Sequence, residues 1–364
     1  MLTEEALKHT PLYEDHLALR AKMVPFGGWD MPVQYEGILA EYEKTRKEAT
    51  LFDICHMGEF RVIGDCLASG LDRIVTMSLK DLPIKESRYG MILNDKGGVI
   101  DDLIIFREDK DRWFIVVNGA TTAKDAAHFE RHLKKGTFEN LSAQLGKLDL
   151  QGPASRAVLK KFVPTIDRLK YFTFDYFDLL GTKTLISRTG YTGELGYEIF
   201  FPRQEIVRLW RQLLKDPCVK PAGLGVRDML RLEVGYSLYG HELDEQITPL
   251  ESGLSRFIDF NKDFVGKEAL LKQKTAGLTR KLVGFISDNR RPPRAEQKIY
   301  SKEQEPMGVV TSGTFSPYLD KGIGCGFVKP EFGAGEKIYF GDDKTKTPAT
   351  IGARIFYKSD SLKS

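Results

Sequence analysis

The sequence lacks long hydrophobic runs, and it lacks the segments that direct a chain into a membrane or out of the cell. No stretch approaches the roughly 18 uninterrupted apolar residues of a membrane-spanning helix. The N-terminus has no charged region followed by an apolar run, so no secretory signal is expected. We therefore predict a cytoplasmic protein with no membrane segment.

The sequence also has few cysteines and a small net charge, and it lacks a dinucleotide-binding fingerprint. The cysteines, Cys55, Cys66, Cys218 and Cys325, lack the spacing of metal ligands, so we expect reduced thiols and no metal site. The net charge of +3 over 364 residues argues against a nucleic-acid binder. Neither glycine cluster of the second half has the third glycine and flanking strand of the dinucleotide fingerprint, which argues against bound NAD or FAD.

The length and the pattern of apolar residues predict more than one domain. A chain of 364 residues exceeds one typical core, and two or three domains are expected. Helix and strand signals alternate irregularly from 37 to 238, and those between 58 and 134 form a compact antiparallel α+β unit. From 280 onward, short apolar segments are separated by Gly, Pro, Asn and Asp, which predicts a small β-barrel or sandwich.

The most informative segment is a strand with two adjacent carboxylates. A turn at 95–98 separates two apolar runs and predicts a hairpin, with its second strand at 99–106. Burying an unpaired carboxylate costs several kcal/mol, so such a residue is usually paired, hydrogen-bonded or catalytic. The alternative is a pair at the strand edge that caps a loop. Side chains alternate along a strand, which puts Ile100, Ile104 and Phe106 on the face of Asp102, and Val99, Leu103 and Ile105 on that of Asp101.

Four other segments are dense in special residues. Two glycines between aromatics at 26–32 suit a tight turn, either at a ligand or in a buried aromatic corner. The segment 52–59 contains His56, which we interpret as structural because no nucleophile accompanies it. Glycines, tyrosines and an acid at 187–198 suit a planar, hydrogen-bonding ligand. The segment 221–228 opens a helix with a loop that carries Arg227, which suits a carboxylate.

Taken together, these segments resemble the T protein of the glycine cleavage system, the tetrahydrofolate-dependent aminomethyltransferase. The resemblance extends from about residue 10 to residue 357, and several blocks in one order make it specific. The blocks are Phe-Gly-Gly-Trp-Asp-Met-Pro at 26–32, Phe-Asp-Ile-Cys-His-Met-Gly-Glu at 52–59, Gly-Gly-Val-Ile-Asp-Asp-Leu at 97–103, Arg-Thr-Gly-Tyr-Thr-Gly-Glu at 188–194 and Pro-Ala-Gly-Leu-Gly-Val-Arg-Asp at 221–228.

The resemblance implies a reaction with a lipoylated partner. The H protein presents an aminomethyl group on its lipoyl arm, ammonia leaves, and tetrahydrofolate, a co-substrate, becomes 5,10-methylenetetrahydrofolate. No metal or flavin is implied, and the family favours a monomer. The family's essential aspartate falls on Asp102. Its charge would stabilise the cationic iminium that forms as ammonia leaves and orient the attacking folate amine; whether it also takes a proton is left open.

The resemblance also implies a folate site made of seven further residues. In this interpretation Glu198 meets the pterin edge, the tyrosines line the rings, and Arg227 holds the glutamate carboxylate of the folate. An arginine in the loop 289–294, with Arg294 favoured, closes the pocket or docks the H protein; a solvated charge run is the alternative. The seven are Tyr89, Asn118, Tyr171, Tyr191, Glu198, Arg227 and Tyr236.

The implied fold is α+β, with three lobes around a central channel and a C-terminal β-barrel. The expected domains are 1–54 with 141–276 for folate, 55–140 as an inserted lobe with the catalytic Asp, and 277–364 as the barrel. For Asp102 and Asn118 to share a ligand, both must project from one face of strands 99–106 and 113–118, a register that the sequence leaves open.

Two other functions on the same scaffold stay open at this point. One is a folate-dependent demethylase, although relatives that oxidise methylamines carry a fused flavin domain for which this chain has no room. The other is a folate-binding relative in iron–sulfur assembly. That branch centres on a Lys-Gly-Cys-Tyr-like motif, which this sequence lacks, and it does not usually keep the Asp-Asp pair.

Overall fold

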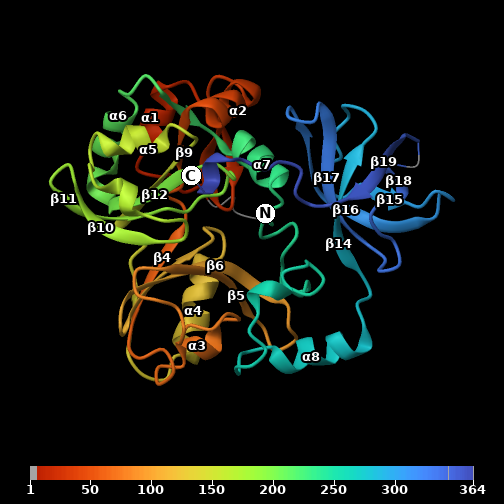
Figure 1. The fold of residues 1–364 in the computed structure, drawn as a ribbon, viewed down its shortest axis with the longest axis horizontal. Coiled ribbons are helices and arrows are strands. Elements are labelled where there is room, and N and C mark those ends of the chain that lie inside the picture. Colours follow the sequence, from red (N-terminus) through yellow and green to blue (C-terminus); the bar gives the residue numbers. More distant parts are fainter. Residues whose placement is uncertain (1–5, 343, 364) are drawn as a thin grey trace.

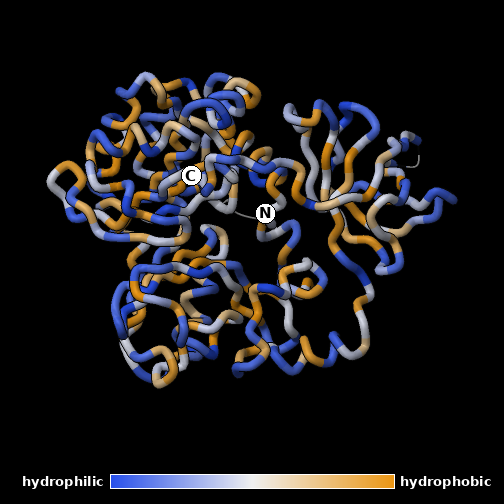
Figure 2. The backbone as a smooth tube through the Cα atoms, in the orientation of Figure 1, coloured by the Kyte–Doolittle hydropathy of each residue, from blue (hydrophilic) through white to orange (hydrophobic). Residues whose placement is uncertain are grey.

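The computed structural model describes residues 6–342 and 344–363, which fold into three lobes (Figure 1). Apolar stretches run through the interior of each lobe and hydrophilic stretches through the outer loops (Figure 2). No helix among the described residues is long and apolar enough to cross a membrane. The expected α+β architecture with a C-terminal barrel is confirmed.

The first lobe is built on a six-stranded mixed sheet. In spatial order its strands are β10 (Phe174–Leu179), β11 (Thr182–Ser187), β12 (Gly196–Pro202), β9 (Leu145–Gln151), β3 (Ala49–Asp53) and β13 (Val219–Ala222). The hairpin of β1 (Lys22–Phe26) and β2 (Trp29–Gln34) lies beside it. Its helices are α1 (Tyr13–Ala18), α2 (Ile38–Lys47), α5 (Ser155–Lys160), α6 (Ile206–Leu213) and α7 (Leu224–Glu233). Leucines and isoleucines of β9 and β12 pack against α5 and α6, and α2 and α7 cover β3.

The second lobe is a five-stranded antiparallel sheet between β3 and β9 in the chain. Its spatial order is β5 (Ser87–Leu93), β6 (Val99–Asp109), β7 (Arg112–Val117), β4 (Gly58–Ile63) and β8 (Thr137–Asn140). One face packs against α3 (Leu71–Ile74) and α4 (Thr122–His132). The opposite face meets the first lobe, where phenylalanines of β6 and β7 contact others of β10 and β12. One strand of this sheet can therefore present residues both to α4 and to the lobe interface.

The third lobe is a closed barrel of six strands. They are β14 (Lys281–Ser287), β17 (Lys321–Val328), β16 (Pro306–Ser316), β15 (Lys298–Tyr300), β18 (Lys337–Gly341) and β19 (Lys346–Gly352). A buried ion pair between Arg231 of α7 and Glu242, at 2.8 Å, joins this lobe to the first, because the Ser312 hydroxyl of β16 bonds to both side chains.

The segment between α7 and the barrel packs against the second lobe. Leu243, Leu254 and Phe264, together with α8 (Lys267–Ala276), cover the end of the sheet formed by β5 and the start of β6. The expected domain boundaries fall between β3 and β4, between β8 and β9, and between α8 and β14. They remain a proposal.

The local expectations were met in part. The hairpin around 95–98 and the strands at 58–63 and 99–106 are present. The helix expected at 37–50 ends at Lys47, because 49–53 is the strand β3. The loop expected around Arg227 is wrong, since α7 already begins at Leu224 and ends at Glu233.

Candidate functional site

A fixed turn positions the start of β6. The Asn94 side chain accepts the backbone N–H groups of Lys96 and Gly98, each at 3.0 Å, and so closes the turn. A Cβ at Gly98 would lie 1.9 Å from the carbonyl oxygen of Glu245, so only glycine allows the crossing segment to approach this closely. The Val99 N–H donates to the carbonyl of Asp244 at 2.9 Å, which anchors the strand that follows.

A β-bulge at Ile100 corrects the expected alternation. Val99 pairs with Leu93 and Asp101 with Ile92, so Ile100 has no partner opposite it. As a result Ile100 lies on the face of Asp101, where it packs with Leu103 and Ile105 under α3 and α4. Val99 lies on the face of Asp102, because it packs with Met91, the residue opposite Asp102 on β5. Beyond the bulge the alternation holds: Ile104 and Phe106 share the face of Asp102 and meet the first lobe.

Asp102 and Asn118 lie in direct contact. The Asn118 amide nitrogen Nδ2 donates to Oδ1 of Asp102 and to Oδ1 of Asp101, both at 2.9 Å. The Asn118 backbone N–H donates to the second oxygen of Asp101, also at 2.9 Å. The Tyr89 hydroxyl donates to Oδ2 of Asp102 at 3.0 Å. Each oxygen of Asp102 therefore receives one donor from the protein and keeps capacity for another.

The surroundings of Asp102 favour a carboxyl group that titrates near neutrality. Burial, and then the negative charge of Asp101, raise the pKa of Asp102 to about 7. The hydrogen bonds from Tyr89 and Asn118 lower this pKa, but by less. Asp101 is fully buried, whereas Asp102 is partly exposed. A partly exposed carboxyl group with a pKa near 7 is suited to acid–base or electrostatic catalysis.

Three of the expected tyrosines lie together. The rings of Tyr191 and Tyr236 stack with centroids 5.7 Å apart, and the hydroxyls of Tyr171 and Tyr236 are 3.4 Å apart. The Arg227 guanidinium lies over the Tyr191 ring, 4.8 Å from its centroid. Burial raises the pKa of Tyr191, the charge of Arg231 lowers it, and the charge of Asp102 is close enough to raise it further. The aromatic group and Asp102 therefore lie near one another.

Glu198 is held in place by a buried lysine. Lys147 of β9, 1% exposed, places its Nζ 2.7 Å from Oε1 of Glu198, and the Thr189 hydroxyl donates to Oε2. Burial raises the pKa of Glu198, but the charge and hydrogen bond of Lys147 outweigh it and hold that pKa below its usual value. Asp149 lies opposite Glu198 in the sheet and pairs with Arg227 at 2.7 Å. Glu198 is thus an ionised acceptor within a network of alternating charges.

Lys147 and Asp149 escaped the sequence analysis. The stretch Lys147 to Gln151 alternates polar and leucine side chains, with Leu148 and Leu150 in the core of the first lobe. This alternation is a strand signal with one polar face, and it could have identified both residues. Gln151 completes the network by donating to Asp149 at 2.5 Å and to the Thr189 carbonyl at 3.1 Å.

The segment 52–59 supports the lobe interior. Asp53 accepts hydrogen bonds from Thr10 at 2.6 Å and bonds His16 at 2.8 Å, which fixes the N-terminal segment. His56 is buried, and burial lowers its pKa to about 4. Glu59 is buried near Lys147, and burial raises its pKa to about 8. At neutral pH both His56 and Glu59 are therefore uncharged.

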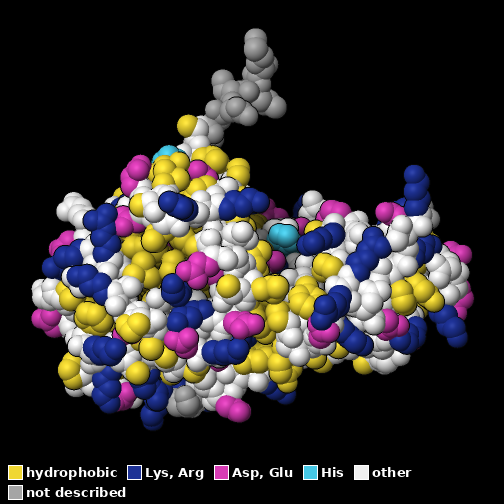
Figure 3. All heavy atoms as spheres, turned by 90° about the horizontal axis from the view of Figure 1, so that it is seen from above, with side chains coloured by type: hydrophobic (Ala, Val, Ile, Leu, Met, Phe, Trp, Pro, Cys, Tyr) yellow, Lys and Arg dark blue, Asp and Glu magenta, His cyan; other side chains and the backbone are white. Residues whose placement is uncertain are grey.

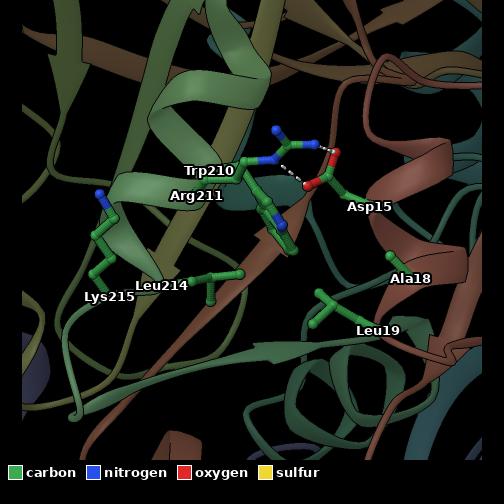
Figure 4. Close-up of a pocket in the computed structure, with 7 residues that line it drawn as sticks. All are labelled: Asp15, Ala18, Leu19, Trp210, Arg211, Leu214 and Lys215. Atoms are coloured by element: carbon green, nitrogen blue, oxygen red, sulfur yellow. Dashed lines mark hydrogen bonds and ion pairs between the residues drawn. The ribbon is translucent and has the colours of Figure 1, made fainter.

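The remaining surface has fewer candidate functional groups. Arg294 is exposed on a barrel loop, where its backbone N–H donates to the Gln297 side chain at 2.9 Å and its carbonyl accepts the Gln297 N–H at 3.2 Å. A shallow hollow between α1 and α6 is lined by Trp210, Leu19 and an Arg211–Asp15 ion pair (Figure 4). On the face in Figure 3, basic and acidic side chains are interspersed across the visible surface. Within 6–342 and 344–363, no three His, Cys, Asp or Glu residues are grouped to hold a metal ion.

Comparisons with known proteins cover almost the whole chain. The family model described as the GCVT N-terminal domain matches residues 12–262, and the glycine cleavage T-protein C-terminal barrel domain matches 280–358. An aminomethyltransferase of Pseudothermotoga lettingae is 42% identical over 363 residues, which cover 98% of this chain and 100% of that protein. One of Desulforamulus reducens is 41% identical with the same coverage. The crystal structure of glycine cleavage system aminomethyltransferase T from Bartonella henselae is 32% identical with a TM-score of 0.91, covering 97% of this chain and 98% of that one.

Proposed function

The chain belongs to the glycine cleavage T-protein family and is an aminomethyltransferase of the glycine cleavage system, and we propose that the Asp102 site performs the transfer. The donor is the aminomethyl group on the lipoyl arm of an H protein, and the acceptor is tetrahydrofolate. Ammonia and 5,10-methylenetetrahydrofolate are the products. This assignment is favoured over a demethylase or a non-catalytic folate-binding protein, because the relatives with nearly full coverage are aminomethyltransferases.

The observation that carries this proposal is the state of the Asp102 carboxyl group. Asn118 and Tyr89 each donate one hydrogen bond to it, and it remains partly exposed. Once ionised, it is a preoriented negative charge for the cation that develops on the one-carbon unit. Such a charge stabilises a transition state because its orientation costs no reorganisation during the reaction. It also accepts a hydrogen bond from the attacking folate amine.

The folate fits the remaining residues by chemistry. Glu198 has two protein donors, Lys147 and Thr189, and a carboxylate has about four lone-pair sites, so it can also accept the N–H groups of an aminopyrimidine. The stacked Tyr191 and Tyr236 offer aromatic faces to the rings. Because Arg227 pairs with Asp149, the strand neighbour of Glu198, we assign Arg227 to the pterin end rather than to the glutamate tail.

The experiment that tests this function measures both products. Purified chain, tetrahydrofolate and aminomethylated H protein should yield ammonia and 5,10-methylenetetrahydrofolate in equal amounts. H protein that carries an unmodified lipoyl arm is the matched control and should give neither product. A chain that binds tetrahydrofolate but releases no ammonia would overturn the proposal.

The pH dependence of the reaction should show the ionisation of Asp102. Since the ionised form is the active one and the pKa of Asp102 is about 7, kcat/KM should rise with pH through an apparent pKa near 7 in the free enzyme. The measurement is the initial rate at low folate concentration from acid to mildly alkaline pH. A profile that is flat across neutrality would contradict this assignment.

Removing the Tyr89 hydroxyl should weaken the reaction and move the pH profile. The hydrogen bond of Tyr89 lowers the pKa of Asp102, so in Tyr89→Phe this pKa rises and the rising limb shifts to higher pH. At neutral pH kcat should fall about tenfold, since a hydrogen bond to a charged group contributes about 1.5 kcal/mol or more. Tyr171→Phe removes a hydroxyl that bonds Tyr236 instead, and in this control the limb should stay in place.

A further inference from the structure

A third carboxyl group lies behind the Asp101–Asn118–Asp102 contact. Asp125 is fully buried in α4, on the face of the second-lobe sheet to which Asp101 points. Its carboxyl group is within hydrogen-bonding reach of the Asp101 carboxylate. No motif in the sequence singled it out, and the reaction proposed above does not use it.

The Asp125 carboxyl group accepts no hydrogen bond of ordinary geometry from the described residues, although the Thr121 hydroxyl lies close enough to lower its pKa. The nearby Thr121 hydroxyl donates to the Asn118 carbonyl at 3.1 Å. An ionised carboxylate in this position would be a buried charge beside a second carboxylate, which costs several kcal/mol. A protonated carboxyl group has an O–H donor of its own and avoids this cost.

We propose that Asp125 is a neutral carboxylic acid that donates its proton in a hydrogen bond to Asp101 and thereby positions Asp102 through Asn118. Asp101 then remains an anion that accepts three hydrogen bonds, one from Asp125 and two from Asn118. The orientation of the Asn118 amide is fixed, because both its backbone and side-chain nitrogens are bound to Asp101. Nδ2 of that fixed amide is what holds Oδ1 of Asp102. The inference rests on Asp102 being the catalytic residue.

The electrostatics of the cluster agree with this arrangement. Burial, and then the charge of Asp101 and the hydrogen bond to it, raise the pKa of Asp125 to about 10. The Thr121 hydroxyl and then the charge of Lys124 lower that pKa. The Lys124 charge is shared with Glu245 at 2.7 Å and the Tyr239 hydroxyl at 2.8 Å. The groups that face Asp102 itself are Asp101, Tyr89, Asn118 and Tyr191. Asp125 therefore stays protonated while Asp102 titrates.

The arrangement gives Asp101 two effects on the catalytic carboxyl group. It holds Asn118, and its negative charge raises the pKa of Asp102 toward neutrality. If the donor at position 125 is lost, the pKa of Asp101 should rise, because the hydrogen bond from Asp125 lowers it, and the negative charge beside Asp102 should be reduced. The pKa of Asp102 should then fall, and the orientation of Asn118 should loosen. A residue with only a structural role would not produce this shift.

The test compares Asp125→Ala with Asp125→Asn, whose amide can still donate to Asp101. Asp125→Ala should lower kcat by about 10- to 100-fold, the equivalent of a hydrogen bond to a charged group of about 1.5–3 kcal/mol, with the KM for tetrahydrofolate nearly unchanged. The rising limb of its pH profile should move to lower pH. Asp125→Asn should recover most of the lost rate and return the limb to its wild-type position. Glu130→Gln removes an exposed carboxylate from the same helix and should behave as wild type.

The outcomes separate this inference from the function on which it rests. Wild-type protein without turnover refutes the function itself. Active wild type with both variants equally impaired would overturn the donor role, and unimpaired Asp125→Ala would overturn any role. If Asp125→Ala does not fold, the protonation state of Asp125 is measured instead by carbon-13 NMR of wild-type protein with labelled aspartate carboxyl groups. The Asp125 signal is the one that is missing from the spectrum of Asp125→Asn. The Asp125 carboxyl should show the shift of a protonated acid at neutral pH; an ionised signal overturns the proposal.

Discussion

Asp102→Asn should lower the rate of aminomethyl transfer by about 100- to 1000-fold, the usual cost of removing one preorganised electrostatic contact, about 3–4 kcal/mol. The substitution keeps the shape of the side chain. Its amide oxygen accepts from Asn118 as Oδ1 does now, and its NH₂ donates to the Tyr89 hydroxyl, which accepts as readily as it donates. The fold and the bound orientation are thus preserved, and only the negative charge is lost.

The measurement for Asp102→Asn combines single-turnover rates of ammonia release with folate affinity. Tetrahydrofolate should bind within a few-fold of the wild-type affinity, because Glu198 and the tyrosines are untouched. Asp95→Asn, in the exposed turn before the same strand, is the matched control and should keep full activity. A variant at position 102 that retained more than a tenth of the wild-type rate would remove Asp102 from the chemistry.

Asp102 was proposed from the sequence on two grounds, and only the second of them distinguishes it from Asp101. The strand pattern at 99–106 forces one carboxylate onto a buried face, and the family motif falls on the second Asp. The faces of Ile100 and Val99 were wrong for a physical reason: a bulge depends on how the partner strand β5 pairs, and the inserted residue has the same apolar character as its neighbours.

The start of α7 shows how tertiary packing overrides local propensity. The segment 221–228 was expected to open a helix with a loop, and a glycine inside a helix costs about 1 kcal/mol. In the structure α7 lies so close to α2 that a Cβ at Gly225 would meet the Ile38 side chain at 2.7 Å. Gly225 allows the two helices to approach closely, and a contact between segments distant in sequence cannot be predicted from a few neighbouring residues.

Asp125 and Lys147 were missed because their roles depend on neighbours distant in sequence. In a helical segment at 123–134, an aspartate is ordinarily solvated, and only the packing of α4 on β6 buries it. Lys147 resembles a surface lysine until β9 pairs with β12 and brings Glu198 within 2.7 Å. A sequence pattern predicts on which face of a strand a residue lies. Predicting its charge partner on the neighbouring strand also requires the pairing register of the two strands.

Lys147→Met should therefore destabilise the chain by about 3–5 kcal/mol, the usual cost of breaking a buried ion pair from one side. Methionine fills a similar volume, but Glu198 is left as a buried carboxylate whose nearest remaining charges are Arg227 and Asp149. The loss is measured as the change in the free energy of unfolding in urea at neutral pH. The double variant Lys147→Met/Glu198→Gln should recover much of it, because removing both charges leaves neither one buried and unpaired.

The pH dependence of this loss distinguishes a charge effect from a packing defect. In the wild type Lys147 keeps the pKa of Glu198 below its usual value, so the pair stabilises the fold above the unfolded pKa, about 4.3, and this contribution is lost as pH falls through the folded pKa. In Lys147→Met the pKa of Glu198 rises above its unfolded value. The folded state then binds more protons than the unfolded state, so the variant loses stability as pH rises from about 4. The difference between the two proteins should be large at neutral pH and shrink toward pH 4. A difference that stayed constant across this range would mean that Lys147 contributes packing and not charge.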